Sequence, residues 1–136
     1  MAAKDSAIIL EEKKKGLNHA LEQATEYAKT QGATQLLILP TDLPRMTVED
    51  LKPFKEYKGF VIVPDREQAG TNALFLNLHA GFSYKFGNSS LDLHLQEAER
   101  LGLKFVLEQN ENLAFDLDTC ADYHLIVLGL TIPKPE

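Results

Sequence analysis

The sequence has little of several features that would place a protein in a special class. It contains one cysteine, Cys120, which excludes an intramolecular disulfide and fits a reducing compartment. No apolar run approaches the length of a membrane span. The opening stretch MAAKDSAIILEEKKK lacks the apolar segment and cleavage site of a secretory signal. The net charge of -6 argues against non-specific binding to nucleic acid, which needs a basic face. We therefore expect a cytoplasmic protein with no nucleic-acid or membrane partner.

The common catalytic motifs are also missing. The sequence has no Walker loop, no GxGxxG and no defensible Ser-His-Asp pattern. Cys120 has no activating neighbour in sequence, and we expect it in the core. The histidines show no metal-ligand spacing, and His94, close to the apolar position Leu91, is expected to be packed or to cap a helix. The four are His19, His79, His94 and His124.

Length and hydrophobic patterning indicate one α/β domain. The chain has 136 residues, of which 44% are hydrophobic, enough for a core in a single domain spanning 1–136. Apolar segments alternate with amphipathic ones, which predicts a mostly parallel sheet flanked by helices. Strands are expected at 7–10, 35–39, 60–63, 72–76 and 103–107, with 35–39 buried on both faces. Helices are expected at 17–31, 47–54, 120–129 and from Ser89 or Ser90 to 101, with QNEN at 109–112 as a loop.

Polar clusters follow two of the predicted strands at the points where these end. PTDLP comes after QLLIL, and PDREQAGTN comes after FVIV. In sheets of this class, ligands bind beyond the carboxyl ends of the strands. Asp42, between two prolines, is held stiffly enough to serve as a metal ligand, but a turn aspartate that bonds its own backbone is an equally good interpretation. The shared placement of these clusters predicts one site.

The segment AFDLDT places Asp116 and Asp118 two positions apart. In an extended backbone they point to the same face and repel each other, while Leu117 points the other way. Water in a turn would relieve the repulsion, and so would a divalent cation. If Asp42 converges with this pair, the three carboxylates suit Mg²⁺, which completes its shell with water and phosphate oxygens.

Three further segments carry weaker signals for an anionic ligand. Gly70 and Thr71 precede a strand, where a threonine hydroxyl can donate to a phosphate oxygen or simply belong to a turn. Gly87, Ser89 and Ser90 precede a helix, whose first N–H groups attract anions, although capping by serine is the plainer interpretation. Similarly, GLNHAL places Gly16 and Asn18 at another helix start, where Asn18 can read a base or ribose edge or can cap the helix.

Taken in order, these segments resemble the phospholactate or phosphoenolpyruvate guanylyltransferase (CofC) family of deazaflavin coenzyme biosynthesis. The similar motifs are GLNHAL, LLILPTDLP, VIVPDREQAGTNALFL, FGNSSLDLHLQEAERLGL and AFDLDT. Each motif alone is weak, whereas the ordered set is fairly specific and covers the chain from about Ala7 to Tyr123. The resemblance implies a nucleotidyltransferase fold of the GT-A type. It also implies transfer of GMP from GTP to a three-carbon phosphoacid, with release of pyrophosphate and a requirement for Mg²⁺.

The resemblance also assigns roles to residues. Asp42, Asp116 and Asp118 match the metal-binding and catalytic aspartates of the family. The substrate-binding positions, which hold the phosphate of the phosphoacid, are matched by Thr71, Gly87 and Ser90. Gly16 and Asn18 match the segment near the nucleoside.

One feature departs from the family pattern. Family members carry a strand and a loop with proline and lysine ahead of the GLN segment, and nothing before Ala7 resembles them, so the chain is similar to the second half of such an enzyme. We expect an exposed sheet edge or pairing with a second copy, and no turnover of GTP by this chain alone. The rival interpretations are a GT-A relative with another nucleotide or acceptor, and a non-catalytic module that binds a phosphoacid or forms an assembly.

Overall fold

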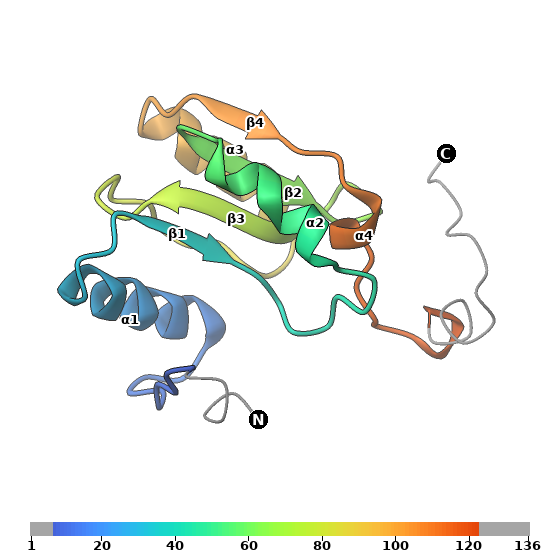
Figure 1. Ribbon diagram of the computed structural model, residues 1–136, viewed down its shortest axis with the longest axis horizontal. Coiled ribbons are helices and arrows are strands. Elements are labelled where there is room, and N and C mark those ends of the chain that lie inside the picture. The colour runs from blue at the N-terminus through green and yellow to red at the C-terminus, as the bar shows by residue number, and fades with distance from the viewer. Residues whose placement is uncertain (1–6, 123–136) are drawn as a thin grey trace.

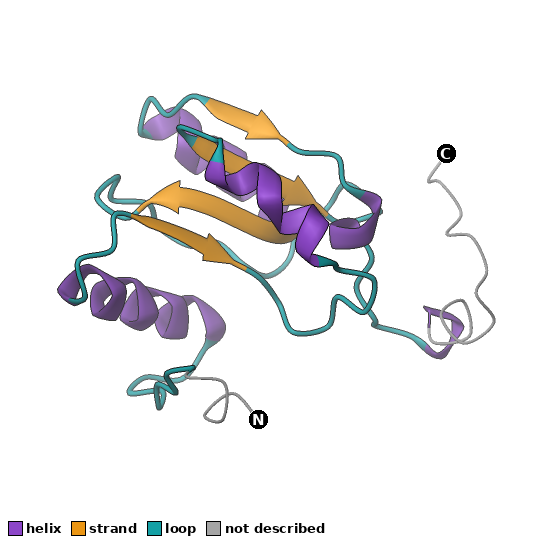
Figure 2. Ribbon diagram, in the orientation of Figure 1, coloured by secondary structure: helices purple, strands orange, loops and turns teal. Residues whose placement is uncertain are grey.

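The computed structural model describes residues 7–122, which form a four-stranded sheet with helices on both faces (Figure 1). The strands lie in the order β1-β3-β2-β4. Figure 2 shows the helices and the strands of this α/β fold by colour. In chain order the elements are α1 (Leu17–Thr30), β1 (Gln35–Ile38), α2 (Val48–Leu51), the 3₁₀ turn η2 (Lys52–Lys55), β2 (Phe60–Pro64), β3 (Thr71–Asn77), α3 (Ser90–Arg100), β4 (Phe105–Leu107) and α4 (Glu111–Ala114).

The sheet is mixed, and the expectation of a mostly parallel sheet holds only in part. β2 pairs with β4 in parallel, whereas β3 is antiparallel to both β1 and β2. Three strands therefore run in one direction and β3 runs against them, as the arrows in Figure 1 show. The cause is the short loop 65–70 between β2 and β3, because a parallel connection needs a crossover of a dozen or more residues. As a result, the first residues of β3 lie at the same end of the sheet as the last residues of β1 and β2.

The core has two layers because side chains alternate across β2 and β3. On one face, Val61, Val63 and Phe75 pack with Phe54 of η2 and Leu113 of α4. The opposite face carries Ile62, Leu74 and Leu76, which pack with residues of α3 and with Leu21 of α1. Leu21 is the residue of α1 that faces this layer, and Gly32, with a φ of 83°, follows the end of that helix. Both central strands are thus covered on both faces.

Several predicted elements differ from the structure. Residues 7–10 form no strand, and Ile8 and Ile9 are exposed. Segment 35–39 is half-buried rather than buried on both faces, because β1 is an edge strand with one neighbour among the described residues. β4 is shorter than expected and is also an edge strand, and QNEN contributes to the short helix α4 instead of a loop. The exposed edge is confirmed, whereas pairing with a second copy stays a prediction.

Other details of the prediction are confirmed. The helix expected at 47–54 begins with a capping box of Thr47 and Asp50, in which the Thr47 N–H donates to the Asp50 carboxylate at 2.8 Å. The expected last helix begins at Cys120, and its residues beyond Asp122 lie outside the described part of the chain. Within 7–122, no helix combines the length and apolar character that crossing a bilayer requires.

Candidate active site

A cluster of three carboxylates lies at the end of the sheet where the chain leaves β1 and β2. Asp42 lies in the loop after β1, and Asp116 and Asp118 lie in the segment after α4. One carboxylate oxygen from each lies within 4.8 Å of the other two. The backbone joins the two segments, since the Leu117 N–H donates to the Asp42 carbonyl at 2.9 Å. The structure therefore brings together the three aspartates that the sequence suggested as metal ligands.

The electrostatics of this cluster disfavour three bare charges. A hydrogen bond with Asp116, followed by partial burial and by the negative charges of Asp116 and Asp42, raises the pKa of Asp118 to about 6. A carboxyl group that stays protonated up to about pH 6 has too little positive charge around it. Oxygen ligands at this spacing suit a hard divalent cation such as Mg²⁺, which would remove the repulsion.

Two polar residues hold the segment that carries Asp116 and Asp118. Asn72 on β3 donates its side-chain amide to the Leu113 carbonyl at 3.0 Å and to the Asp116 carboxylate at 3.3 Å. Asp122 accepts from the N–H groups of Asp118 and Thr119 at 3.1 and 2.9 Å. Sequence reasoning assigned no role to Asn72 or Asp122, although Asn72 sits within the GTNAL motif.

Positive charge reaches this region through Arg66, from the loop after β2. Its guanidinium pairs with Asp122 at 2.8 Å, and this contact is the main reason that the pKa of Asp122 falls to about 2. The same guanidinium stacks on the buried ring of Phe115 at 4.4 Å, and that of Arg45 lies 4.7 Å from the centre of this ring. Phe115 therefore joins the carboxylate segment to the loops after β1 and β2.

A second group, the hydroxyl pair Thr71 and Ser90, lies where β3 begins. Thr71 and Ser90 are 8% and 3% exposed, and the Thr71 N–H donates to the Ser90 hydroxyl oxygen at 2.9 Å. Neither Ser89 nor Ser90 caps α3 through its side chain: Ser89 occupies the N-cap position without a side-chain hydrogen bond. The plainer capping interpretation of these serines is thus wrong, because the Ser90 hydroxyl binds the β3 backbone instead.

Residues 85–87 are tied to the hydroxyl pair through His94 of α3. This side chain is fully buried, as expected, and contacts the Lys85 N–H and the Thr71 hydroxyl, each at 2.9 Å. Gly87 lies two residues after Lys85. It is exposed and has a φ of 129°, which favours glycine. The backbone of Gly87 is therefore positioned from the same histidine that contacts Thr71.

Asn18 of α1 also holds this loop. Its side-chain oxygen accepts from the Phe86 N–H at 2.9 Å, and its amide donates to the Phe86 carbonyl at 3.1 Å. Gly16 occupies the N-cap of α1 with a φ of 114°. The structure thus gives Asn18 a clear task in fixing the segment before Gly87, and the assignment of Gly16 and Asn18 to the nucleoside stays a prediction.

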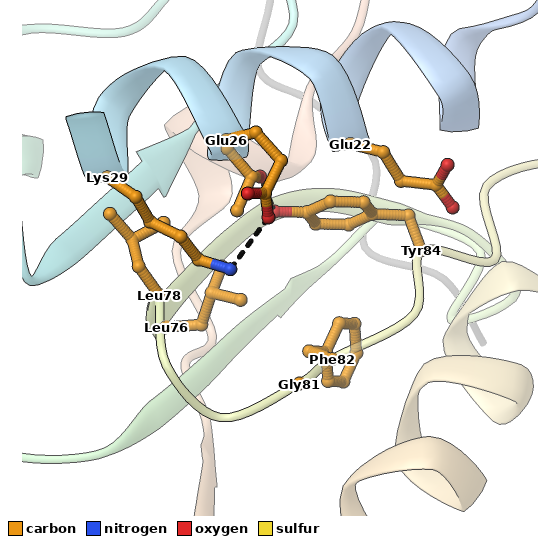
Figure 3. A pocket seen from close by; sticks show the side chains of 9 residues that line it. Glu22, Glu26, Lys29, Leu76, Leu78, Gly81, Phe82 and Tyr84 are labelled. Atoms are coloured by element: carbon orange, nitrogen blue, oxygen red, sulfur yellow. Dashed lines mark hydrogen bonds and ion pairs between the residues drawn. The ribbon is translucent and has the colours of Figure 1, made fainter.

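Two other features lie outside these groups. Cys120 is exposed rather than in the core. A cavity of about 370 Å³ lies between α1 and the segment after β3 (Figure 3). Lys29 and Glu26 pair above it and the ring of Tyr84 forms a wall, but none of its lining residues belongs to the carboxylate cluster or the hydroxyl pair.

Comparison with known proteins decides the family. The family profile described as "Guanylyl transferase CofC like" matches residues 2–130. The chain belongs to the CofC family. It is 40% identical over 111 residues to the phosphoenolpyruvate guanylyltransferase of Rubrobacter xylanophilus, covering 79% of this chain and 54% of that protein. It is 31% identical over 120 residues to the 2-phospho-L-lactate guanylyltransferase of Methanocaldococcus vulcanius, covering 86% and 53%.

A solved structure supports the fold of this CofC-family chain. The chain is similar to a Desulfovibrio desulfuricans G20 protein assigned to the nucleotide-diphospho-sugar transferases, with a TM-score of 0.70, 14% identity and coverage of 89% of this chain and 55% of that one. This similarity confirms the α/β fold of the GT-A type. The chain spans about half the length of the curated relatives that it matches.

Proposed function

We propose that this chain carries the acceptor-binding and metal-binding part of a guanylyltransferase that joins GMP from GTP to phosphoenolpyruvate or 2-phospho-L-lactate. The observation that supports this most is the arrangement at the start of β3. Consecutive side chains point to opposite faces of a strand, so the Thr71 hydroxyl contacts His94 of α3, while the Asn72 amide donates to Asp116 of the carboxylate cluster. The Thr71 main-chain N–H binds the Ser90 hydroxyl oxygen on the α3 side. A phosphate bound at Thr71 and Ser90 would therefore lie next to Asn72, the residue whose side chain binds Asp116 of the carboxylate cluster.

The carboxylate cluster would hold Mg²⁺ through Asp42, Asp116 and Asp118, and the cation would offset the negative charge of the two phosphorylated substrates. The hydroxyls of Thr71 and Ser90, with the backbone near Gly87, would bind and orient the phosphate of the acceptor. An oxygen of this phosphate forms a bond to the α-phosphorus of GTP as the bond to the β-phosphate breaks, and pyrophosphate leaves. The attacking oxygen is already anionic near neutral pH, so the reaction needs orientation rather than a general base.

Calorimetric titration with phosphoenolpyruvate and with GTP, each with Mg²⁺ present, tests the proposal. We expect phosphoenolpyruvate to bind, and Thr71→Val to weaken this binding in a fully folded variant. Glu56→Gln, which changes an exposed carboxylate on η2's flank, is the matched control and should bind as the wild type does. Binding of neither substrate at millimolar concentration would refute the proposal.

The titration also separates the rival interpretations. Binding of the phosphoacid without GTP, and no pyrophosphate release, would indicate an acceptor-binding module, whereas turnover near one per second would show a competent enzyme. The guanine preference, the cytoplasmic location and pairing with a second copy stay predictions.

A further inference from the structure

His94 is hydrogen-bonded to two segments near the start of β3. It lies on α3 with both ring nitrogens engaged: Nε2 is 2.9 Å from the Lys85 N–H, and Nδ1 is 2.9 Å from the Thr71 hydroxyl oxygen. The rings of Phe82 and Phe86 pack beside it, with centroids 5.7 and 4.7 Å away. The imidazole is therefore held in one orientation by two hydrogen bonds and two aromatic contacts.

The position of the imidazole proton follows from these partners. A main-chain N–H can only donate, so the Lys85 N–H requires Nε2 to be unprotonated and to accept. Burial lowers the pKa of His94 to about 4, so the ring is neutral near pH 7 and carries its one proton on Nδ1. Nδ1 then donates to the hydroxyl oxygen of Thr71.

The hydroxyl of Thr71 is thereby restricted to one role. Its oxygen accepts from His94, and its own proton is left to donate to a different acceptor. The Ser90 oxygen is in the same situation, because it accepts from the Thr71 N–H. Phosphate oxygens can only accept, so two hydroxyls that each already accept one hydrogen bond, and whose protons must point away from that donor, suit a phosphate better than freely rotating ones.

We propose that His94 is a positioning residue that fixes the Thr71 hydroxyl as a donor toward the phosphate of the acceptor. This inference rests on the proposed function, which supplies the phosphate. His94 touches no substrate itself and acts through Thr71. Its second bond, to the Lys85 N–H, holds the loop that leads to Gly87, so one side chain aligns two parts of the phosphate site.

Two substitutions separate the two bonds of His94. The side-chain amide of His94→Asn can place an N–H where Nδ1 lies, which keeps the bond to Thr71 and loses the one to Lys85. His94→Gln can place its oxygen where Nε2 lies, which keeps the bond to Lys85 and loses the donor to Thr71. Both variants remove the same ring, so their losses of folding stability should be similar.

Calorimetric titration of the folded variants with phosphoenolpyruvate and Mg²⁺ tests the inference. We expect His94→Gln to weaken phosphoenolpyruvate binding about tenfold, the same loss that we expect for Thr71→Val. The affinity of His94→Asn should stay within about threefold of that of the wild type. Long-range ¹H–¹⁵N spectra of the ligand-free wild type should show His94 protonated on Nδ1 alone, with assignment from the variants.

The outcomes distinguish this inference from the proposed function. Equal affinity in His94→Asn and His94→Gln, or a ring protonated on Nε2, would overturn the role of His94 while leaving phosphoenolpyruvate binding intact. Absence of phosphoenolpyruvate binding by the wild type would overturn the proposed function, and the role of His94 with it.

Discussion

Asp118→Asn should stabilise the metal-free protein near neutral pH. Protonated Asp118 can donate a hydrogen bond to Asp116, whereas at pH 7.5, above its raised pKa, Asp118 is ionised and lies against the acidic side chains of Asp116 and Asp42. An asparagine keeps the shape and can donate its amide to Asp116, but it carries no charge. The substitution therefore removes the charge of Asp118 and supplies the hydrogen-bond donor that the ionised carboxylate lacks.

The size of the effect follows from the pKa. A pKa raised from 3.8 to about 6 corresponds to roughly 3 kcal/mol at about 1.4 kcal/mol per unit. Asp118 is exposed, so solvent and salt screen most of this, and we expect about 1 kcal/mol. For a chain of this length, that free energy corresponds to a melting temperature about 3–5 °C higher.

The sign of the pH dependence gives a sharper test. Because the folded state raises the pKa of Asp118, its contribution to stability is fully present below about pH 4 and is lost as the pH rises through 6. The advantage of Asp118→Asn should thus be small at pH 4 and complete above pH 7. The comparison must use the difference between variant and wild type, since His94 titrates in the same range with the opposite sign.

Urea unfolding in EDTA at pH 4 and pH 7.5 measures this difference, with Glu56→Gln as the control. Addition of 10 mM Mg²⁺ at pH 7.5 should stabilise the wild type by about 1.4 kcal/mol if its dissociation constant is near 1 mM, and should stabilise Asp118→Asn much less. Equal stability of the two proteins in EDTA, combined with an equal response to Mg²⁺, would refute the metal-site reasoning.

Three further predictions concern the residues around the site. The wild type should lose on the order of 3 kcal/mol of stability relative to His94→Asn as the pH falls from 6.5 to 4, because the unfolded chain takes up a proton at His94 whereas the buried ring, with its pKa of about 4, stays neutral. A stability difference that does not change with pH in urea unfolding would contradict this. Asn72→Ala should cost about 1–3 kcal/mol, since it leaves the Leu113 carbonyl unpaired, and a cost near zero in urea unfolding would exclude this role. Arg66→Met should lower the free energy of unfolding by about 1.5–3 kcal/mol, because it leaves Asp122 without its ion pair. It should also speed amide exchange at Thr119, whose N–H donates to Asp122, and unchanged exchange would show that Asp122 holds the 118–119 backbone without Arg66.

The carboxylate cluster could be predicted because its members follow simple sequence rules. Asp42 comes directly after an apolar strand, and Asp116 and Asp118 share a face by their spacing of two. What the sequence could not show is which loops meet, because that depends on strand order. Strand order is decided by long-range packing, and the five predicted apolar runs are compatible with several orders.

The direction of β3 was missed although a signal was present. The apolar run Asn72–Leu76 indicates a buried strand but not its direction, since both faces are covered in either case. The loop 65–70 held the information, because so short a connection allows only an antiparallel neighbour. Loop length was therefore a better guide to topology here than the alternation of strands and helices.

Supporting residues were harder to find than ligand candidates. His94 resembles a core position by spacing, and its burial was anticipated, but its two hydrogen-bond partners come from segments that only the fold brings near. Asn72 reads as an ordinary strand residue. The function of such residues lies in the partner that each side chain meets, and local sequence carries no information about that partner.

The antiparallel direction of β3 places the hydroxyl pair and the residue that holds the carboxylate segment at one end of the sheet. A parallel strand would bring its last residue to this edge, whereas β3 brings its first two, Thr71 and Asn72, there. Their side chains leave opposite faces, so one strand supplies a hydroxyl toward α3 and an amide toward α4. A register shift of one residue would exchange these faces and separate both side chains from their partners. The bonds of Thr71 to Ser90 and of Asn72 to Leu113 oppose such a shift, so β3 keeps the hydroxyl pair and the residue that holds the carboxylate segment at adjacent positions of one strand.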